Sequence, residues 1–89
     1  MHKGHYLVCY DITDHKRLQK VFRISRRYGV AFQYSVVYLH ASQDVVDTLL
    51  AELADVIDHG SDDVRAYRIR SLQQIQTLGE PIQPSGIVW

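Results

Sequence analysis

The chain has 89 residues, of which 46% are hydrophobic and 22% are charged, and its formal net charge is zero. This composition is too apolar for a disordered protein, and the length suits one domain whose modest core dimerisation would help to stabilise. No apolar run approaches the roughly 20 residues that span a bilayer, and the N-terminus has no signal-peptide pattern, so we expect a cytoplasmic protein without membrane contact. The single cysteine, Cys9, excludes an internal disulfide and is expected to be a small core side chain.

Charge is segregated along the chain. Residues 14–28 contain six Lys or Arg and one acid, whereas residues 42–63 contain seven Asp or Glu and no Lys or Arg. The domain should therefore have a positive flank that could contact a polyanion and a negative flank. The negative flank is either a solvated surface or a docking surface for a basic protein.

The first predicted element is a strand over residues 6–11 that ends on a carboxylate, Asp11. Its side chains are apolar on both faces, which is typical of a central strand covered on both sides. A helix should follow, with Thr13 or Asp14 as its N-cap and Gly29 as a left-handed stop. Its apolar residues share one face, and a basic stripe lies on the opposite face.

Three further elements complete the pattern. Residues 31–40 are extended, either as one bent strand or as a short strand followed by a longer one. Ser42 can cap a second helix that ends near Asp58, and residues 63–70 form another strand. The order predicts an α+β, ferredoxin-like βαββαβ sandwich with an antiparallel sheet and both helices on one face.

The other face of this sheet needs cover, and a second copy of the chain provides it most simply. We therefore expect a homodimer with the sheets face to face. Residues 1–78 would be the ferredoxin-like domain. Residues 79–89 would be a C-terminal extension that adds an extra strand to the sheet edge of the partner subunit.

The strand-end acid and the basic stripe are the features that point to chemistry. Asp11 occupies a place where α/β sheets expose functional groups, but it could equally be a turn carboxylate, and Asp14 fits a helix cap better than a metal ligand. The basic side chains suit phosphate backbones, although they could also form an ordinary solvated helix face; they are Lys16, Arg17, Lys20, Arg23, Arg26 and Arg27. His15 is the histidine to test as a proton shuttle.

Five segments in register carry a resemblance to a known family. The chain resembles the small CRISPR-associated adaptation proteins, ferredoxin-like dimers described as endoribonucleases. The matching segments are Tyr10-Asp11-Ile12-Thr13-Asp14, Lys16-Arg17-Leu18-Gln19-Lys20-Val21, Tyr28-Gly29 with Gln33-Tyr34-Ser35-Val36, Asp63-Val64-Arg65-Ala66-Tyr67 and Gly86-Ile87-Val88-Trp89.

The resemblance implies a site and partners. Asp11 would be a catalytic acid and a ligand of Mg²⁺ or Mn²⁺ near the dimer axis, with Tyr10 beside it in the catalytic set. Gln33 and Ser35 would be hydrogen-bonding residues around it, and Lys16, Arg17, Lys20, Arg23 and Arg27 would bind nucleic acid. The implied partners are the CRISPR integrase, duplex DNA and, as a further candidate, single-stranded RNA.

Three functions fit this resemblance. The first is a metal-dependent phosphodiesterase on RNA or DNA that takes part in spacer acquisition and bridges the integrase. The second is a purely structural DNA-binding scaffold in the same process. The third is a toxin-type ribonuclease of the same fold.

Overall fold

The computed structural model describes residues 2–71 and 73, so the predicted extension over residues 79–89 and its exchange lie outside the described residues. The described part contains four strands and two helices, in the order predicted. They are β1 (Gly4–Asp11), α1 (His15–Arg26), β2 (Val30–Gln33), β3 (Val36–Ala41), α2 (Gln43–Ala54) and β4 (Asp63–Ile69).

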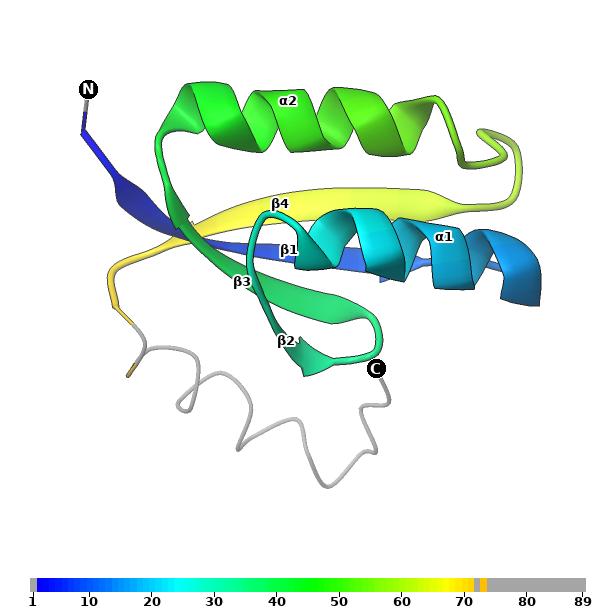
Figure 1. The fold of residues 1–89 in the computed structure, drawn as a ribbon, viewed down its shortest axis with the longest axis horizontal. Helices are drawn as coiled ribbons and strands as arrows, with labels where there is room; N and C mark the ends of the chain where they lie inside the picture. The colour runs from blue at the N-terminus through cyan, green and yellow to red at the C-terminus, as the bar shows by residue number, and fades with distance from the viewer. Residues whose placement is uncertain (1, 72, 74–89) are drawn as a thin grey trace.

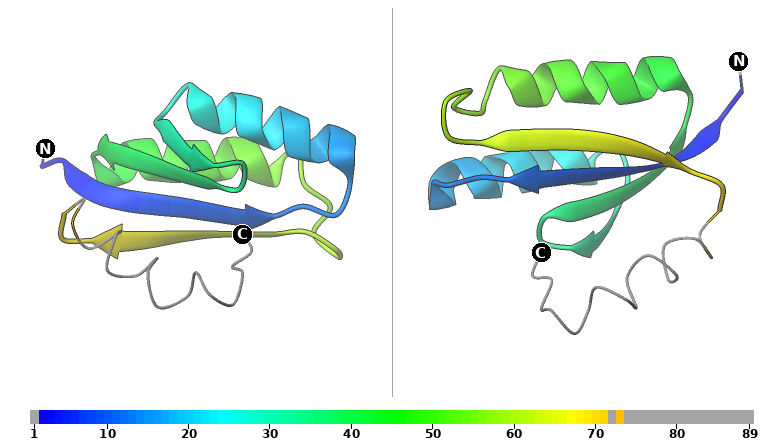
Figure 2. Two further views of the ribbon diagram at one scale, coloured as in Figure 1. Left: turned by 90° about the horizontal axis from the view of Figure 1, so that it is seen from below. Right: turned by 180° about the vertical axis from the view of Figure 1, so that it is seen from behind.

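The strands form one sheet in the order β2-β3-β1-β4, and every neighbouring pair is antiparallel. Both helices lie over the same face of this sheet (Figures 1 and 2). The ferredoxin-like α+β prediction is thus confirmed. β1 lies between β3 and β4, as its apolar sequence predicted, but only its helix side is covered by described elements.

α1 begins and ends for different local reasons. The Asp14 side chain accepts a hydrogen bond from the backbone N–H of Arg17, so Asp14 is the N-cap. Arg23 and Arg26 lie in the last turn, where positive charge is favoured by the helix dipole. The prediction of a left-handed stop at Gly29 was wrong, because its φ lies outside the left-handed region. Glycine is needed there because a Cβ would overlap the Tyr38 carbonyl oxygen on β3.

α2 is capped by Ser42, whose side chain accepts from the backbone N–H of Val45. The helix ends at Ala54, earlier than the predicted end near Asp58, and a loop of residues 55–62 leads into β4. Val46, Leu49 and Leu53 form its fully buried stripe. No helix among the described residues is long and apolar enough to cross a membrane.

Residues 31–40 form a short strand followed by a longer one, the second of the two alternatives considered. Tyr34 and Ser35 make the turn between β2 and β3, and the pairing register shifts between Ala31 and Gln33. A bulge of this kind places an extra residue, Phe32, in β2 and twists the hairpin.

Alternation along the strands divides the sheet into two different faces. The helix face holds the main core, which includes Tyr6, Val8, Val37 and Leu39 packed against the buried sides of α1 and α2. The opposite face, called the open face below, holds a small cluster of Leu7, Val36 and Ile69 together with the more exposed side chains Val30, Phe32 and Tyr67.

Candidate functional site

Two carboxylates lie opposite each other where β1 ends and β4 begins. Asp11 is the last residue of β1, Asp63 is the first residue of β4, and the antiparallel register pairs them directly. Both residues are exposed. Like charges directly opposite in a sheet destabilise it, so this pair is an unfavourable arrangement that a cation or a basic group would relieve.

The two acids line a hollow of about 480 Å³ at this end of the sheet. Arg65, one strand period along from Asp63, donates from Nε to Asp63 Oδ2 at 2.8 Å. This exposed pair neutralises part of the charge of Asp63. The Asp11 carboxylate makes no hydrogen bond or ion pair to the described residues. The lining residues are Cys9, Tyr10, Asp11, Ile12, Leu18, Tyr34, Ser35, Asp63 and Arg65.

Tyr10 is adjacent to Asp11 in sequence but its side chain lies on the other face of the sheet. It belongs to the helix-side core, with 5% of its surface exposed. Burial raises the pKa of the Tyr10 hydroxyl to about 12, and the neighbouring Ser25 hydroxyl offsets part of that rise. The phenol is therefore neutral at pH 7, and strand alternation places it on the opposite face of the sheet from the Asp11 carboxylate.

Of the two residues predicted to surround Asp11, Ser35 lies at the hollow and Gln33 does not. Ser35 lines the hollow, and its carbonyl oxygen accepts a hydrogen bond from the backbone N–H of Tyr10 at 3.1 Å. This bond holds the β2–β3 turn against the end of β1. Gln33 is exposed at the end of β2 and does not line the hollow.

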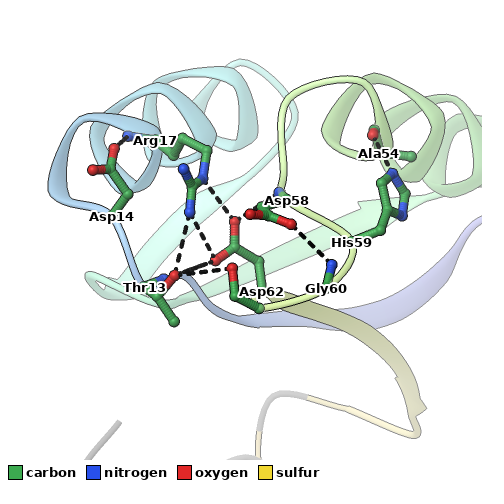
Figure 3. Close-up of polar contacts among 9 residues, drawn as sticks. Thr13, Asp14, Arg17, Ala54, Asp58, His59, Gly60 and Asp62 are labelled. Atoms are coloured by element: carbon green, nitrogen blue, oxygen red, sulfur yellow. Dashed lines mark hydrogen bonds and ion pairs between the residues drawn. The ribbon is translucent and has the colours of Figure 1, made fainter.

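A buried carboxylate fixes the loops on both sides of the acid pair. Asp62 accepts five hydrogen bonds, from Thr13 N and Oγ1, from Arg17 Nε and Nη2, and from Asp58 N, at 2.8 to 3.4 Å. In Figure 3 the Arg17 side chain from α1 and the Asp62 side chain point toward each other, with Thr13 beside them. Asp62 directly precedes Asp63, and Thr13 follows Asp11 by two residues. We call Thr13, Arg17 and Asp62 the brace.

The electrostatics of the brace follow from its hydrogen bonds. The Asp62 side chain is fully buried and that of Arg17 is 31% exposed. The Arg17 guanidinium, followed by the backbone and hydroxyl donors, holds the pKa of Asp62 well below its usual range. In return, the hydrogen bond to Asp62 raises the pKa of Arg17. The ion pair is therefore formed by two charged groups at pH 7.

Two of the predicted nucleic-acid-binding residues on the basic surface of α1 are already paired with acids. Arg17, predicted to bind nucleic acid, has its guanidinium occupied by Asp62, and Arg27 lies 3.5 Å from Glu52 on α2. Tyr28 also donates to Glu52. Within residues 2–71 and 73, four cations of α1 have no ion pair and are exposed: Lys16, Lys20, Arg23 and Arg26.

Comparison with known proteins identifies the family. The family described as CRISPR associated protein Cas2 matches residues 4–77. The chain belongs to the Cas2 family. It is 31% identical to "CRISPR-associated endoribonuclease Cas2 1" of Nitrosomonas europaea, over 94% of this chain and 80% of that protein. It is 38% identical to "CRISPR-associated endoribonuclease Cas2 2" of Thermodesulfovibrio yellowstonii, over 83% and 81% of the two chains.

Solved structures agree with this Cas2 assignment. Streptococcus pyogenes Cas2 superposes with a TM-score of 0.72 at 26% identity, covering 81% of this chain and 93% of that one. A hypothetical protein from Thermus thermophilus superposes with a TM-score of 0.73 at 29% identity, covering 78% and 84%. The names of the Cas2 relatives support a place among CRISPR-associated nucleases.

Sequence reasoning missed two acids at this candidate site. Asp63 was read as part of a family segment, and Asp62 was counted only among the acids of the negative flank. The position of Asp63 could have been predicted, because an acid that starts a strand antiparallel to β1 lies near the acid that ends β1. The role of Asp62 could not have been predicted, because its contacts with Thr13 and Arg17 join residues that are 45 to 49 positions apart in the sequence.

Proposed function

We propose that the chain acts in CRISPR adaptation as a divalent-metal-dependent phosphodiesterase whose essential acid is Asp11. The observation that carries the proposal is the pairing of Asp11 with Asp63 at an open hollow, in a chain of the Cas2 family. The names of the curated relatives supply the reaction class. The reaction is hydrolysis of a phosphodiester bond in RNA or DNA.

The donor chemistry of the hollow fits Mg²⁺ or Mn²⁺. The described residues hold no group of three or more His, Cys, Asp or Glu side chains that could bind a metal. Mg²⁺ requires fewer protein ligands, because it keeps several waters and is often bound by one or two carboxylates together with substrate phosphates. Asp11 and Asp63 would hold the ion. When bound, it would supply Lewis-acid stabilisation of the charge that develops on the phosphoryl oxygens.

The chain's own residues bind and orient. Arg65 donates a hydrogen bond to the Asp63 carboxylate, and the brace fixes the loop that follows Asp11 and the loop that precedes Asp63. Lys16, Lys20 and Arg23 would contact phosphates on the α1 side, where no ion pair with a described residue competes for them. Such contacts position a nucleic acid without reading its sequence.

A homodimer is part of the proposal. The open face combines the cluster of Leu7, Val36 and Ile69 with the exposed side chains of Phe32 and Tyr67, and no described element covers it. An apolar face of this kind is typical of a protein–protein contact. A second copy placed over it would bring two Asp11 residues to one cleft, as the family resemblance implies.

A scaffold role is the second candidate, supported by the four unpaired cations Lys16, Lys20, Arg23 and Arg26 on one helix. In this role the dimer would bridge integrase subunits and support duplex DNA. The two functions differ in what Asp11 must do. Only the phosphodiesterase requires its carboxylate.

The deciding experiment measures metal-dependent cleavage of defined RNA and DNA by the wild type, Asp11→Ala and Asp63→Asn. Asp11→Ala should lower the cleavage rate at least about 100-fold, because the charge stabilisation depends on the ion that this carboxylate holds. Asp63→Asn should lower it less. Asp55→Asn, which removes an exposed carboxylate from the end of α2, is the matched control and should leave the rate unchanged.

The outcomes separate the candidates. Wild-type cleavage by Asp11→Ala, or cleavage that persists in EDTA, would contradict the phosphodiesterase. If Asp11→Ala abolishes cleavage while spacer acquisition continues, the scaffold role is primary. Loss of acquisition by Asp11→Ala, with the dimer and the integrase complex intact, contradicts a pure scaffold.

A further inference from the structure

Aromatic and basic side chains meet in a groove between α1 and the β2–β3 turn. The groove has a volume of about 420 Å³ and is lined by Gln19, Phe22, Arg23, Arg26 and Tyr34. Four of these residues come from α1, and Tyr34 comes from the turn. The groove is separate from the acid pair but adjoins it, because Tyr34 also lines the hollow that contains Asp11.

The Tyr34 ring is held in place but not covered. It packs edge-to-face on Phe22, with ring centroids 4.7 Å apart and an interplanar angle of 70°. Tyr34 is nevertheless 52% exposed. Its hydroxyl makes no hydrogen bond to the described residues, so neither burial nor a polar contact explains a tyrosine at this position.

Turn chemistry makes this tyrosine more unusual. Tyr34 and Ser35 form a tight connection between two antiparallel strands, where Gly, Asn and Asp are favoured because they accept the turn backbone. A large aromatic at such a turn goes against the local preference, and its edge contact with Phe22 still leaves Tyr34 52% exposed. Departures of this kind are expected where a residue has a function.

The cations around the ring are placed for phosphates. The Arg26 guanidinium carbon lies 5.7 Å from the centroid of the Phe22 ring, and Arg26 is exposed. Arg23 is exposed and makes no ion pair within residues 2–71 and 73. Exposed aromatic rings flanked by arginines are the combination that binds single strands, with bases stacked on the rings and phosphates on the cations.

We propose that this groove binds a single-stranded segment of RNA or DNA, with Tyr34 stacked on one unpaired base and Arg23 and Arg26 in contact with the flanking phosphates. The proposal rests on the nucleic-acid function proposed above and adds to it a base-stacking subsite between α1 and the β2–β3 turn. Bases in a duplex are already stacked on each other, so a duplex has no free base face for Tyr34. Because Tyr34 also borders the acid hollow, the bound strand would continue toward Asp11.

The test measures binding without cleavage. Wild-type protein in EDTA is titrated into single-stranded RNA and DNA oligonucleotides that contain 2-aminopurine, and into duplex DNA of the same sequence. Stacking on an aromatic ring quenches the fluorescence of this base. Tyr34→Ala should weaken single-strand binding roughly 5- to 150-fold, the range expected for one lost stacking contact, and should abolish the quench.

Two variants control for folding and for aromatic character. Tyr34→Phe keeps the ring and should retain both affinity and quench. Val45→Ala shortens an exposed apolar side chain, 39% exposed, on α2, outside both the groove and the open face, and should leave single-strand binding unchanged. Thermal melting of Tyr34→Ala should show a single cooperative transition, lowered only by the loss of the edge contact with Phe22, because the turn residue lies outside the buried core.

The outcomes distinguish this proposal from the function on which it rests. If the wild type binds single strands and Tyr34→Ala binds them equally well, the stacking site is refuted while Asp11 chemistry stands. An equal loss of single-strand and duplex affinity in Tyr34→Ala also refutes stacking, because it indicates a general backbone contact. If the wild type binds no single strand in EDTA at any salt concentration, the stacking site is refuted, and the cleavage assay with metal decides the phosphodiesterase separately.

Discussion

The two faces of the sheet are made by the same four strands but differ in burial. On the helix face, Val8, Val37 and Leu39 are fully buried beneath α1 and α2. On the open face, Phe32 and Tyr67 remain about half exposed. The period-two alternation of each strand thus buries Tyr10 on the helix face and leaves Asp11 exposed on the open face.

Removing a large side chain from the helix face should have the largest effect. Leu39→Ala leaves a cavity in the middle of the core and should lower the free energy of unfolding by about 2 to 5 kcal/mol. The matched change on the open face is Phe32→Ala, which should leave the stability of the single subunit almost unaltered. Urea unfolding of the two variants, at a concentration where the protein is monomeric, checks the difference. Equal losses would show that the open face also belongs to a folded core.

Breaking the brace should have the next largest effect. Asp62→Asn removes the charge that Arg17 and the backbone donors stabilise, and should lower the melting temperature by on the order of 10 °C at pH 7. Glu52→Gln is the matched control, because Glu52 also joins two elements, through Arg27 and Tyr28, but is 39% exposed. Glu52→Gln should lower the melting temperature less than Asp62→Asn does.

The pH dependence of the same pair gives a second readout. The folded-state pKa of Asp62 is lower than its unfolded value of about 4, so its stabilising contribution is complete above that value. The contribution declines as the pH falls toward the folded pKa. The gap in melting temperature between wild type and Asp62→Asn should therefore be constant from pH 7 to pH 5 and narrow below pH 4. A constant gap in acid would contradict the brace.

Tyr10→Phe should have the smallest effect of the series. The Tyr10 hydroxyl and Ser25 Oγ are both buried without a hydrogen-bond partner among the described residues, so removal of the hydroxyl should change stability by less than about 1 kcal/mol. Cleavage should also be unchanged, because the ring lies on the helix face. A loss of cleavage comparable to that of Asp11→Ala would instead support the predicted catalytic role of Tyr10.

The sequence predicted the elements well because periodicity and caps are local. Asp14 and Ser42 cap their helices as expected, and the extended run of residues 31–40 divides into two strands. Gly29 was located correctly but explained wrongly, since its reason is a close approach to β3 that only the folded chain reveals.

The site was less predictable because its parts come from distant segments. Asp11 was singled out by its place at a strand end, but its pairing with Asp63 depends on the β1–β4 register. Arg17 was grouped with the nucleic-acid-binding residues because a basic stripe gives no sign of which cation an internal acid will occupy. The opposite orientations of Tyr10 and Asp11, by contrast, follow from strand alternation and could have been stated from the sequence.

The pairing of β1 with β4 joins the two ends of the described domain and has a consequence for folding. The chain between the two strands is long, and bringing its ends together lowers the chain entropy before stabilising contacts form. We therefore expect the β1–β4 pairing to form late and to slow folding. The acid pair and the brace do not form until that step is complete. A nascent or truncated chain that lacks residues 62–69 would thus have Asp11 without Asp63 and Asp62, and we expect it to lack the proposed activity until β4 has paired with β1.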